Sequence, residues 1–185
     1  MPLSEAGQEP VMWFAMSAPY RNEMKAKNFL DEKGIENFLP LQYKIRTNRY
    51  GRKERKALPV VSNLLFVHTT QSIIRQAKQG VSFLQYRTRP VNEKNQPIIV
   101  PDSQMRQFIA VCQTMSSDLI YLEPSAISLA KGARVRIIGG AFDGVEGYFV
   151  KIKGVRSRRV VVEVEGLAVA TAEIEPQYIE VIKNE

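Results

Sequence analysis

The chain has 185 residues, 44% of them hydrophobic and 24% charged, which suits two small folded domains better than one domain or a disordered chain. With one cysteine and one histidine, an intramolecular disulfide is excluded, and a Cys/His zinc site or a histidine-assisted nucleophile lacks its partners. We therefore expect neither an enzyme nor a bound metal or cofactor. The formal net charge is +7.

The sequence predicts neither a membrane span nor a secretion signal. No apolar run approaches the roughly 20 residues that cross a bilayer. Residues 1–10 carry Glu5 and Glu9 where a signal peptide carries Lys or Arg, and we expect them to form a flexible N-terminus. We therefore expect a cytoplasmic protein without a membrane partner.

The first elements in chain order are a strand and a helix. The continuous apolar run Val11–Ser17 is typical of a strand buried on both faces. Asn22 is a suitable N-cap for the helix that follows, and Gly34 ends it. The apolar stripe of this helix is expected to contain Ala26, Phe29 and Leu30.

A second strand is expected at residues 37–41, where Pro40 indicates a sheet edge. After it, residues 41–56 hold seven Lys or Arg side chains and one acid, without apolar periodicity, so an exposed loop or hairpin is expected. Its cations suit phosphate contact and Tyr43 and Tyr50 suit base stacking, although many charge runs are only solvated faces. The cations are Lys44, Arg46, Arg49, Arg52, Lys53, Arg55 and Lys56.

Four further elements complete the first domain. The run 63–67 predicts a central strand with His68 on the surface at its end, followed by a short helix that Gly80 closes. Residues 81–86 predict a strand, and residues 91–96 a polar turn. A helix begins at Asp102 and has the apolar stripe Met105, Phe108, Ile109, Cys112 and Met115, with Cys112 a buried structural thiol.

The pattern changes at residue 129. Short Val- and Ile-rich runs separated by glycines predict an all-β domain over residues 129–185, after an α+β domain over residues 11–115 and a linker over residues 116–128. In the run 160–165, we expect a half-buried strand with Val160, Val162 and Val164 on one face and Glu163 and Glu165 on the other.

Each of the two predicted domains resembles a known protein family. The segment from Lys131 to Ile152 resembles the KOW motif, with Gly140, Gly144 and Gly147 at its glycine positions and Phe142 at its aromatic position. Trp13-Phe14, residues 63–67, Gly80-Val81 and residues 98–101 resemble the NusG N-terminal domain in order and spacing. The resemblance implies a small antiparallel sheet with helices, followed by an SH3-like KOW barrel.

One departure suggests a subfamily. Where housekeeping NusG proteins carry a Phe-Pro-Gly-Tyr sequence, this chain has Val61-Ser62-Asn63-Leu64. It looks more similar to the specialised RfaH-like paralogues, and its length and pattern are closest to the UpxY-type antiterminators of polysaccharide operons.

The resemblance implies partners and surfaces. An apolar surface of the first domain would bind the clamp helices of RNA polymerase through Ala15, Ser17, Val61, Leu64 and Ile99, unless these are plain core residues. The start of the first helix and the turn before the fourth strand would face the non-template DNA strand through Arg21, Asn22, Lys25, Arg75 and Lys78. The KOW barrel would recruit a small-subunit ribosomal protein or Rho, and the chain would be a monomer.

The sequence therefore predicts a processive antitermination factor that acts on specific operons. A general NusG factor that couples polymerase to the ribosome or Rho is the first alternative, and a KOW-containing, RNA-binding ribosome-associated protein is the second.

Overall fold

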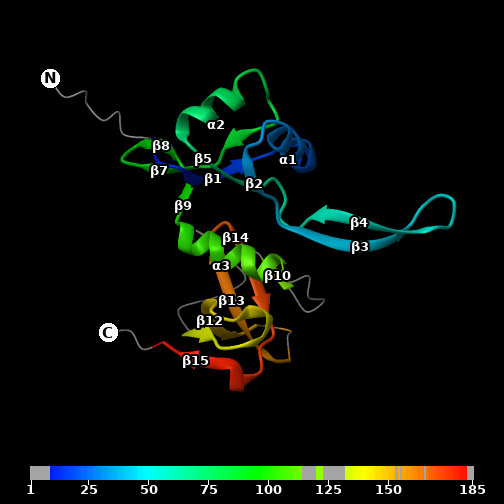
Figure 1. Ribbon diagram of the computed structural model, residues 1–185, viewed down its shortest axis with the longest axis vertical. Helices are drawn as coiled ribbons and strands as arrows, with labels where there is room; N and C mark the ends of the chain where they lie inside the picture. Colours follow the sequence, from blue (N-terminus) through cyan, green and yellow to red (C-terminus); the bar gives the residue numbers. More distant parts are fainter. Residues whose placement is uncertain are drawn as a thin grey trace. The chain divides into compact units, whose positions relative to one another are not determined.

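The computed structural model describes residues 9–113, 120–122, 132–152, 154, 156–164 and 166–182 (Figure 1). The chain forms two compact units. The first contains the described part of Met1–Leu39 together with Ser62–Pro101, and the second contains Pro40–Val61 and the described part of Asp102–Glu185. Residues 1–8 of the predicted flexible N-terminus lie outside the described residues, and the predicted domain boundaries stay a prediction.

The sheet of the first unit is built around β1 (Met12–Ser17), the apolar run that the sequence predicts to be a buried strand. β1 pairs antiparallel with β5 (Leu65–Thr69), β6 (Gln85–Tyr86) and β9 (Ile99–Val100), and β2 (Glu36–Phe38) pairs with β5. Four consecutive side chains of β1 are at most 6% exposed. Because both faces of β1 are covered, its sequence is continuously apolar instead of alternating.

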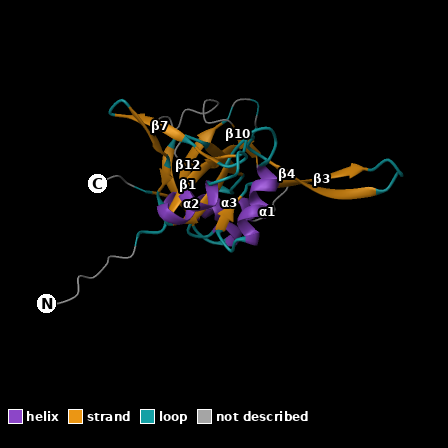
Figure 2. Cartoon of the chain, turned by 90° about the horizontal axis from the view of Figure 1, so that it is seen from above, coloured by secondary structure: helices purple, strands orange, loops and turns teal. Residues whose placement is uncertain are grey.

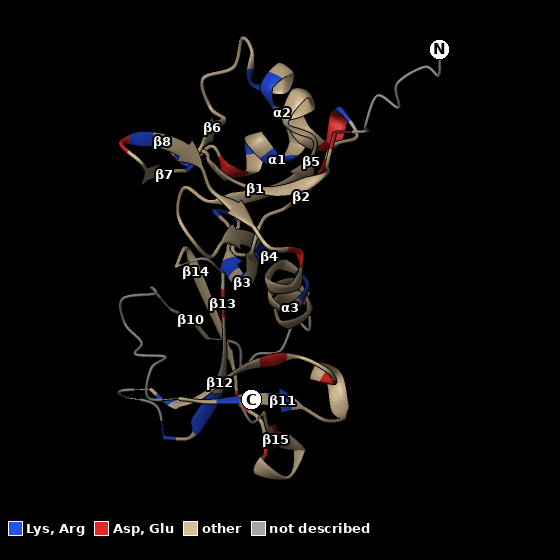
Figure 3. Ribbon diagram, turned by 90° about the vertical axis from the view of Figure 1, so that its left-hand side faces the viewer, with Lys and Arg blue, Asp and Glu red and all other residues tan. Residues whose placement is uncertain are grey.

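Two helices, α1 (Glu23–Glu32) and α2 (Gln71–Lys78), lie on the same side of this sheet (Figures 1 and 3). Both occur where the sequence predicts them. The side chains that they bury follow the helical spacing and are Ala26 and Leu30 in α1 and Ile74 and Ala77 in α2.

The start of α1 differs from the prediction. Asn22 does precede the helix, but its side-chain amide donates to the Pro19 carbonyl oxygen at 2.8 Å and accepts no helix N–H. Tyr20 and Arg21 adopt left-handed backbone angles, with φ of 60° and 59°, so the chain turns sharply between β1 and α1. The Asn22 amide closes this turn, and it is therefore not the N-cap acceptor.

Between α2 and the next helix, two predictions are wrong. Of the strand expected at residues 81–86, only β6 forms. The polar turn expected at residues 91–96 is a hairpin of β7 (Thr88–Val91) and β8 (Lys94–Pro97). The two turn residues, Asn92 and Glu93, have φ of 48° and 63°. Positive φ at both positions is typical of the two-residue turns whose twist matches that of the flanking strands. This hairpin has no buried face to impose an apolar alternation, so the sequence pattern does not indicate it.

The basic segment forms the hairpin of β3 (Leu41–Thr47) and β4 (Lys53–Pro59), one of the two forms that the sequence allows. The strand predicted at residues 37–41 is divided, since β2 ends at Phe38 and β3 begins at Leu41. Pro40 lies between them, and it has no N–H to continue a ladder.

The second unit also contains α3 and a six-stranded antiparallel sheet in the order β10-β14-β13-β12-β11-β15. Ile120–Leu122, within the predicted linker, form a strand, because their backbone pairs with Val169–Thr171. Met115 of the predicted stripe lies outside the described residues. The elements are α3 (Asp102–Gln113), β10 (Ile120–Leu122), β11 (Ala133–Ile137), β12 (Glu146–Lys151), β13 (Arg158–Val164), β14 (Ala168–Ala172) and β15 (Ile179–Val181).

In strand β13, Val160, Val162 and Val164 are buried on one face as predicted and Glu163 on the other face is partly exposed, but the strand is more buried than expected. Glu165 lies outside the described residues. Val160, Val161 and Val162 are all buried, and Arg159 is only 2% exposed. Val161 packs in a cluster with valines and isoleucine of the neighbouring strands, and α3 packs against β13 and β14. Both faces of β13 are therefore covered. Arg159 is buried because its guanidinium donates to the side chain and the carbonyl of Thr171, at 2.8 and 3.2 Å.

Candidate functional site

The β3–β4 hairpin carries all seven predicted cations of the basic segment. In Figures 1 and 2 its strands form a ribbon of their own, paired only with each other. The seven side chains are all exposed, and they are Lys44, Arg46, Arg49, Arg52, Lys53, Arg55 and Lys56. The structure therefore brings these cations together on one exposed element.

The register divides the hairpin into two chemically different faces. Residues directly opposite one another in an antiparallel pair share a face, as do residues two apart along a strand. The first, which we call the cationic face, contains Lys44 opposite Lys56 and Arg46 opposite Glu54. The other, which we call the mixed face, contains Tyr43, Ile45, Thr47, Lys53 and Arg55.

Two arginine guanidinium groups of the hairpin stack on aromatic rings. On the mixed face, the Arg55 guanidinium lies over the Tyr43 ring, 4.2 Å from its centroid. At the tip, the Arg49 guanidinium lies 4.9 Å from the centroid of the Tyr50 ring, and Tyr50 is 72% exposed. Such stacking holds both guanidinium groups in defined positions at a modest gain of about 0.5–1 kcal/mol each.

The tip is built by Asn48. Its side-chain oxygen accepts from the backbone N–H groups of Tyr50 and Arg52, at 2.9 and 3.0 Å, and its amide donates to Glu54 at 2.5 Å. Gly51 supplies the left-handed residue, with φ of 76°. The one acid of the hairpin is thus used in the turn, and the cations around it keep their positive potential.

A second group of predicted residues gathers in the first unit around residues 83–86. The Lys25 ammonium of α1 lies 4.5 Å from the centroid of the Phe83 ring, and the Lys78 ammonium of α2 lies 4.2 Å from that of Tyr86. Burial raises the pKa of Tyr86, and the positive charge of Arg75 opposes that rise. The structure therefore brings Lys25, Arg75 and Lys78 to one segment, while Arg21 and Asn22 lie in the turn before α1.

The sequence did not single out Phe29 and Phe83 as surface residues. Phe29, expected in the buried stripe of α1, is only partly buried and makes an edge-to-face contact with Phe83, with ring centroids 5.4 Å apart. Lysines lie over both rings, Lys25 over Phe83 and Lys33 over Phe29. The i, i+4 spacing of Lys25, Phe29 and Lys33 was the available signal, but the same spacing also describes a core stripe.

The five predicted polymerase-binding residues are not equally accessible. Ala15 and Leu64 have no exposed surface, Ser17 and Val61 are partly buried, and Ile99 is 39% exposed. Ala15 and Ser17 are two residues apart in β1 and therefore lie on the same face of the sheet. Ile99 lies directly opposite Phe14 and therefore belongs to the other face. In this structure, Ile99 is the most accessible of the five.

Asn63 connects three elements of the first unit. It lies just before β5 with φ of 57°, and its side-chain oxygen accepts from the Ser17 hydroxyl at 2.6 Å. Its backbone N–H donates to the carboxylate of Glu23 at 2.7 Å, and its carbonyl accepts from Arg87 at 2.9 Å. These bonds explain how Glu23 is accommodated at only 5% exposure.

The single histidine and the single cysteine have structural surroundings. His68 is part of β5 and not beyond its end; its ring stacks on Trp13, and its Nδ1 lies 2.6 Å from a Glu36 carboxylate oxygen. Cys112 lies on α3, and burial raises the pKa of its thiol to about 12. A thiol with that pKa is almost fully protonated near neutral pH and is a poor nucleophile.

The glycine pattern of the second unit is explained by its backbone. Gly140 begins the short 3-10 helix η3 (Gly140–Phe142) between β11 and β12 and Gly144 lies shortly after it, with φ of 74° and 79°. Phe142 is partly buried. A Cβ on Gly147 would collide with the Val161 carbonyl oxygen and lie 3.0 Å from the Val160 side chain, so β12 approaches β13 too closely there for a larger residue.

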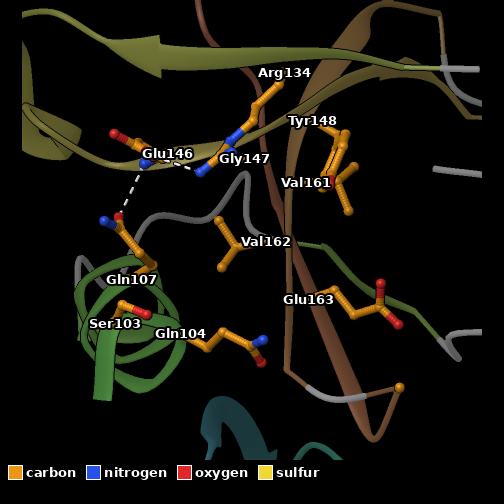
Figure 4. Close-up of a pocket in the computed structure, with 11 residues that line it drawn as sticks. Ser103, Gln104, Gln107, Arg134, Glu146, Gly147, Tyr148, Val161, Val162 and Glu163 are labelled. Carbon is orange, nitrogen blue, oxygen red and sulfur yellow. Dashed lines mark hydrogen bonds and ion pairs between the residues drawn. The ribbon is translucent and has the colours of Figure 1, made fainter. Parts of the chain in front are cut away.

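A pocket of about 510 Å³ lies in the second unit between α3 and strands β12 and β13 (Figure 4). Gln107 accepts from the Glu146 backbone N–H at 2.9 Å across it, and Glu146 pairs with Arg136 at 2.7 Å. The hydrogen bond from Arg136 lowers the pKa of Glu146, so this carboxylate stays charged and paired. The lining contains neither histidine nor cysteine.

Within the described ranges of the chain, no three His, Cys, Asp or Glu side chains gather as a metal site would require. Among the described helices, none combines the length and the apolar character that crossing a bilayer takes.

Comparisons with known proteins identify a family. A family model described as transcription termination factor NusG matches residues 12–109, more than half of the chain. A solved structure that describes domain interaction in NusG of Thermotoga maritima shares 19% sequence identity, covering 94% of this chain and 98% of that chain with a TM-score of 0.44. No curated protein matches the sequence.

Proposed function

This chain belongs to the NusG family of transcription factors, whose members generally bind RNA polymerase, and from that premise we propose that it is an elongation and antitermination factor for specific operons. In this proposal the first unit binds the polymerase clamp helices, and the basic surfaces bind nucleic acid. Bridging the clamp would hold it closed over nucleic acid and disfavour paused states. This role requires positioning and no bond chemistry.

The concentration of seven cations on the exposed β3–β4 hairpin carries the nucleic-acid part of the proposal. Each cation that contacts a phosphate releases a counterion, so affinity is expected to fall steeply with salt. The tip aromatic Tyr50, 72% exposed, can also stack on a base.

The surface around residues 83–86 supports contact with a single DNA strand. Lys25, Arg75 and Lys78 supply positive charge, and the partly exposed Phe29 and Phe83 supply rings on which a base can stack. Phosphate contacts alone would position the chain without selecting a sequence, so selection would depend on such base contacts. We propose this surface for the non-template strand.

For the polymerase contact, the proposed residues of the first unit are Ala15, Ser17, Leu64 and Ile99, whereas Val61 of the original prediction belongs to the second unit. Ile99 is exposed and supports a contact through its own face of the sheet, which is the face opposite Ala15 and Ser17. Because Ala15 and Leu64 have no exposed surface, their participation would require a rearrangement that uncovers them. Removal of apolar surface from water would then supply the affinity, at about 25 cal/mol per Å² buried.

For the second unit we propose a KOW domain that recruits a protein partner, either a small-subunit ribosomal protein or Rho. The two left-handed glycines around η3 and the close approach at Gly147 support the motif. Residues 129–185 hold nearly equal numbers of cations and acids, which suits a protein partner better than nucleic acid.

Two experiments test the proposal. Purified chain passed over immobilised RNA polymerase should be retained, and complete failure to bind would exclude the polymerase-bound role and leave the ribosome-associated alternative. Mapping of chromosomal occupancy should find the chain on a few long operons, as expected of a specialised factor of the UpxY type. Uniform occupancy of transcribed genes would instead support a general NusG factor.

A further inference from the structure

The β3–β4 hairpin has the dimensions of an element that enters a nucleic-acid groove. Two paired strands lie about 4.8 Å apart, and the seven residues of each extend roughly 23 Å. The major groove of B-form DNA is about 12 Å wide and admits a two-stranded ribbon, whereas its minor groove is about 6 Å wide. The major groove of duplex RNA is too deep and narrow for side chains to read. Shape therefore favours duplex DNA over duplex RNA.

The cationic face is arranged for phosphates. Lys44 lies directly opposite Lys56, and like charges in that relation destabilise a β pair. Both side chains are exposed, and the only acid of this face, Glu54, is hydrogen-bonded by Asn48. An anion that bridges the two ammonium groups would remove the repulsion, and phosphates along the rim of a groove supply such anions. Long lysine side chains can reach that rim from a ribbon lying in the groove.

The mixed face has the residue types that contact base edges. Ile45 lies in the middle of β3, directly opposite Arg55, and is 73% exposed. Aliphatic side chains can contact the methyl group of thymine. Arg55 is held over Tyr43 at 4.2 Å, which orients its guanidinium, and arginine pairs with guanine in the major groove. Thr47 can hydrogen-bond to either kind of base edge.

We propose that the β3–β4 hairpin enters the major groove of duplex DNA with its mixed face toward the base edges, while the long side chains of the outward, cationic face extend past the strand edges to the phosphates of the rim. This inference depends on the proposed function only in that the hairpin binds nucleic acid. It specifies the duplex as the form bound and divides the residues between sequence reading and positioning. A single-stranded partner would instead need aromatic rings along one face, and this hairpin has one ring there.

The test measures binding of the full chain to a labelled DNA duplex, its single strands and an RNA duplex of the same sequence, over a series of salt concentrations. Duplex DNA should bind about tenfold or more tightly than the other two. Replacing Lys44 and Lys56 by glutamine should lower the slope of log affinity against log salt by about 2, equally on all sequences. Arg89→Gln with Lys94→Gln, which removes two cations from the β7–β8 hairpin, is the matched control and should leave the slope nearly unchanged.

Sequence reading is tested by a variant without charge change. Ile45→Ser with Thr47→Val should keep the salt slope and alter which sequences are selected from a pool of random duplexes. Unaltered selection would overturn the assignment of base reading to the mixed face. Equal or tighter binding to single strands would overturn binding in the major groove of a duplex. Either result leaves the hairpin as a nucleic-acid contact and the proposed function intact. Parental affinity in every hairpin variant would reject both the groove and the hairpin contact, while polymerase retention would still report separately on the role in transcription.

Discussion

The hairpins β3–β4 and β7–β8 have the same local architecture but very different densities of positive charge. Each is a two-stranded sheet of its own. The β7–β8 hairpin holds two cations and one acid between Thr88 and Pro97, whereas the β3–β4 hairpin holds seven cations and one acid. A ribbon in this protein can therefore form without concentrated charge. The ribbon architecture therefore does not account for the charge of the longer hairpin, including the unfavourable Lys44–Lys56 pair, and we propose that this charge serves binding.

Charge reversal of the longer hairpin should have the largest effect. Arg52→Glu, Lys53→Glu and Arg55→Glu together should weaken binding to a transcription complex on the order of a hundredfold and flatten its salt dependence, because phosphate contacts become repulsions. Affinity measured across a salt series checks this. The matching reversal of Arg89 and Lys94 on the shorter hairpin should change affinity less than about threefold, and comparable losses from both hairpins would remove the distinction between them.

The shorter hairpin should instead matter for stability. Arg87 precedes it and donates to the Asn63 carbonyl at 2.9 Å, so Arg87→Met leaves that carbonyl without this bond. We expect a loss of about 1–2 kcal/mol in the free energy of unfolding, measured by urea denaturation, with DNA affinity nearly unchanged. Arg87→Lys, which keeps a donor, should recover part of the loss. A variant of parental stability would show that Arg87 does not anchor this hairpin.

The smallest expected effect has opposite signs for stability and binding. Lys56→Glu places a carboxylate opposite Lys44 and replaces a repulsive cross-strand pair by an attractive one. The hairpin should become more stable by roughly 0.2–1 kcal/mol, while affinity for DNA falls. Thermal unfolding and DNA titration of the same variant check both signs, with Lys56→Gln as the uncharged control. A parallel change in stability and affinity would contradict a binding role for the pair.

Elements with a buried face could be predicted from the sequence. The run that became β1 and the spacings of Ala26 with Leu30 and of Met105 with Phe108 report burial directly. The β7–β8 hairpin was missed because neither of its faces is buried. In β13 the valines and Glu163 lie on the predicted faces, but the burial of Val161 was not predicted, because only the structure shows that both sides of the strand are covered.

The candidate site was predictable in charge but not in arrangement. Composition located the seven cations of residues 44–56, but only the register shows that Lys44 faces Lys56 and that Ile45 lies beside Arg55. The contact of Phe29 with Phe83 joins residues more than fifty positions apart, and no local pattern reports it. Likewise, the Asn22 amide could cap the helix or close the preceding turn, and tertiary structure selects the turn.

We propose that the first unit contacts polymerase and the β3–β4 hairpin contacts DNA, and site-specific photocrosslinking within an assembled elongation complex tests this division most directly. A photoreactive residue in place of Ile99 should crosslink to a polymerase subunit, and one in place of Tyr50 should crosslink to DNA, since both positions are exposed. Absence of a polymerase crosslink from position 99, together with hairpin crosslinks to protein alone, would contradict the account.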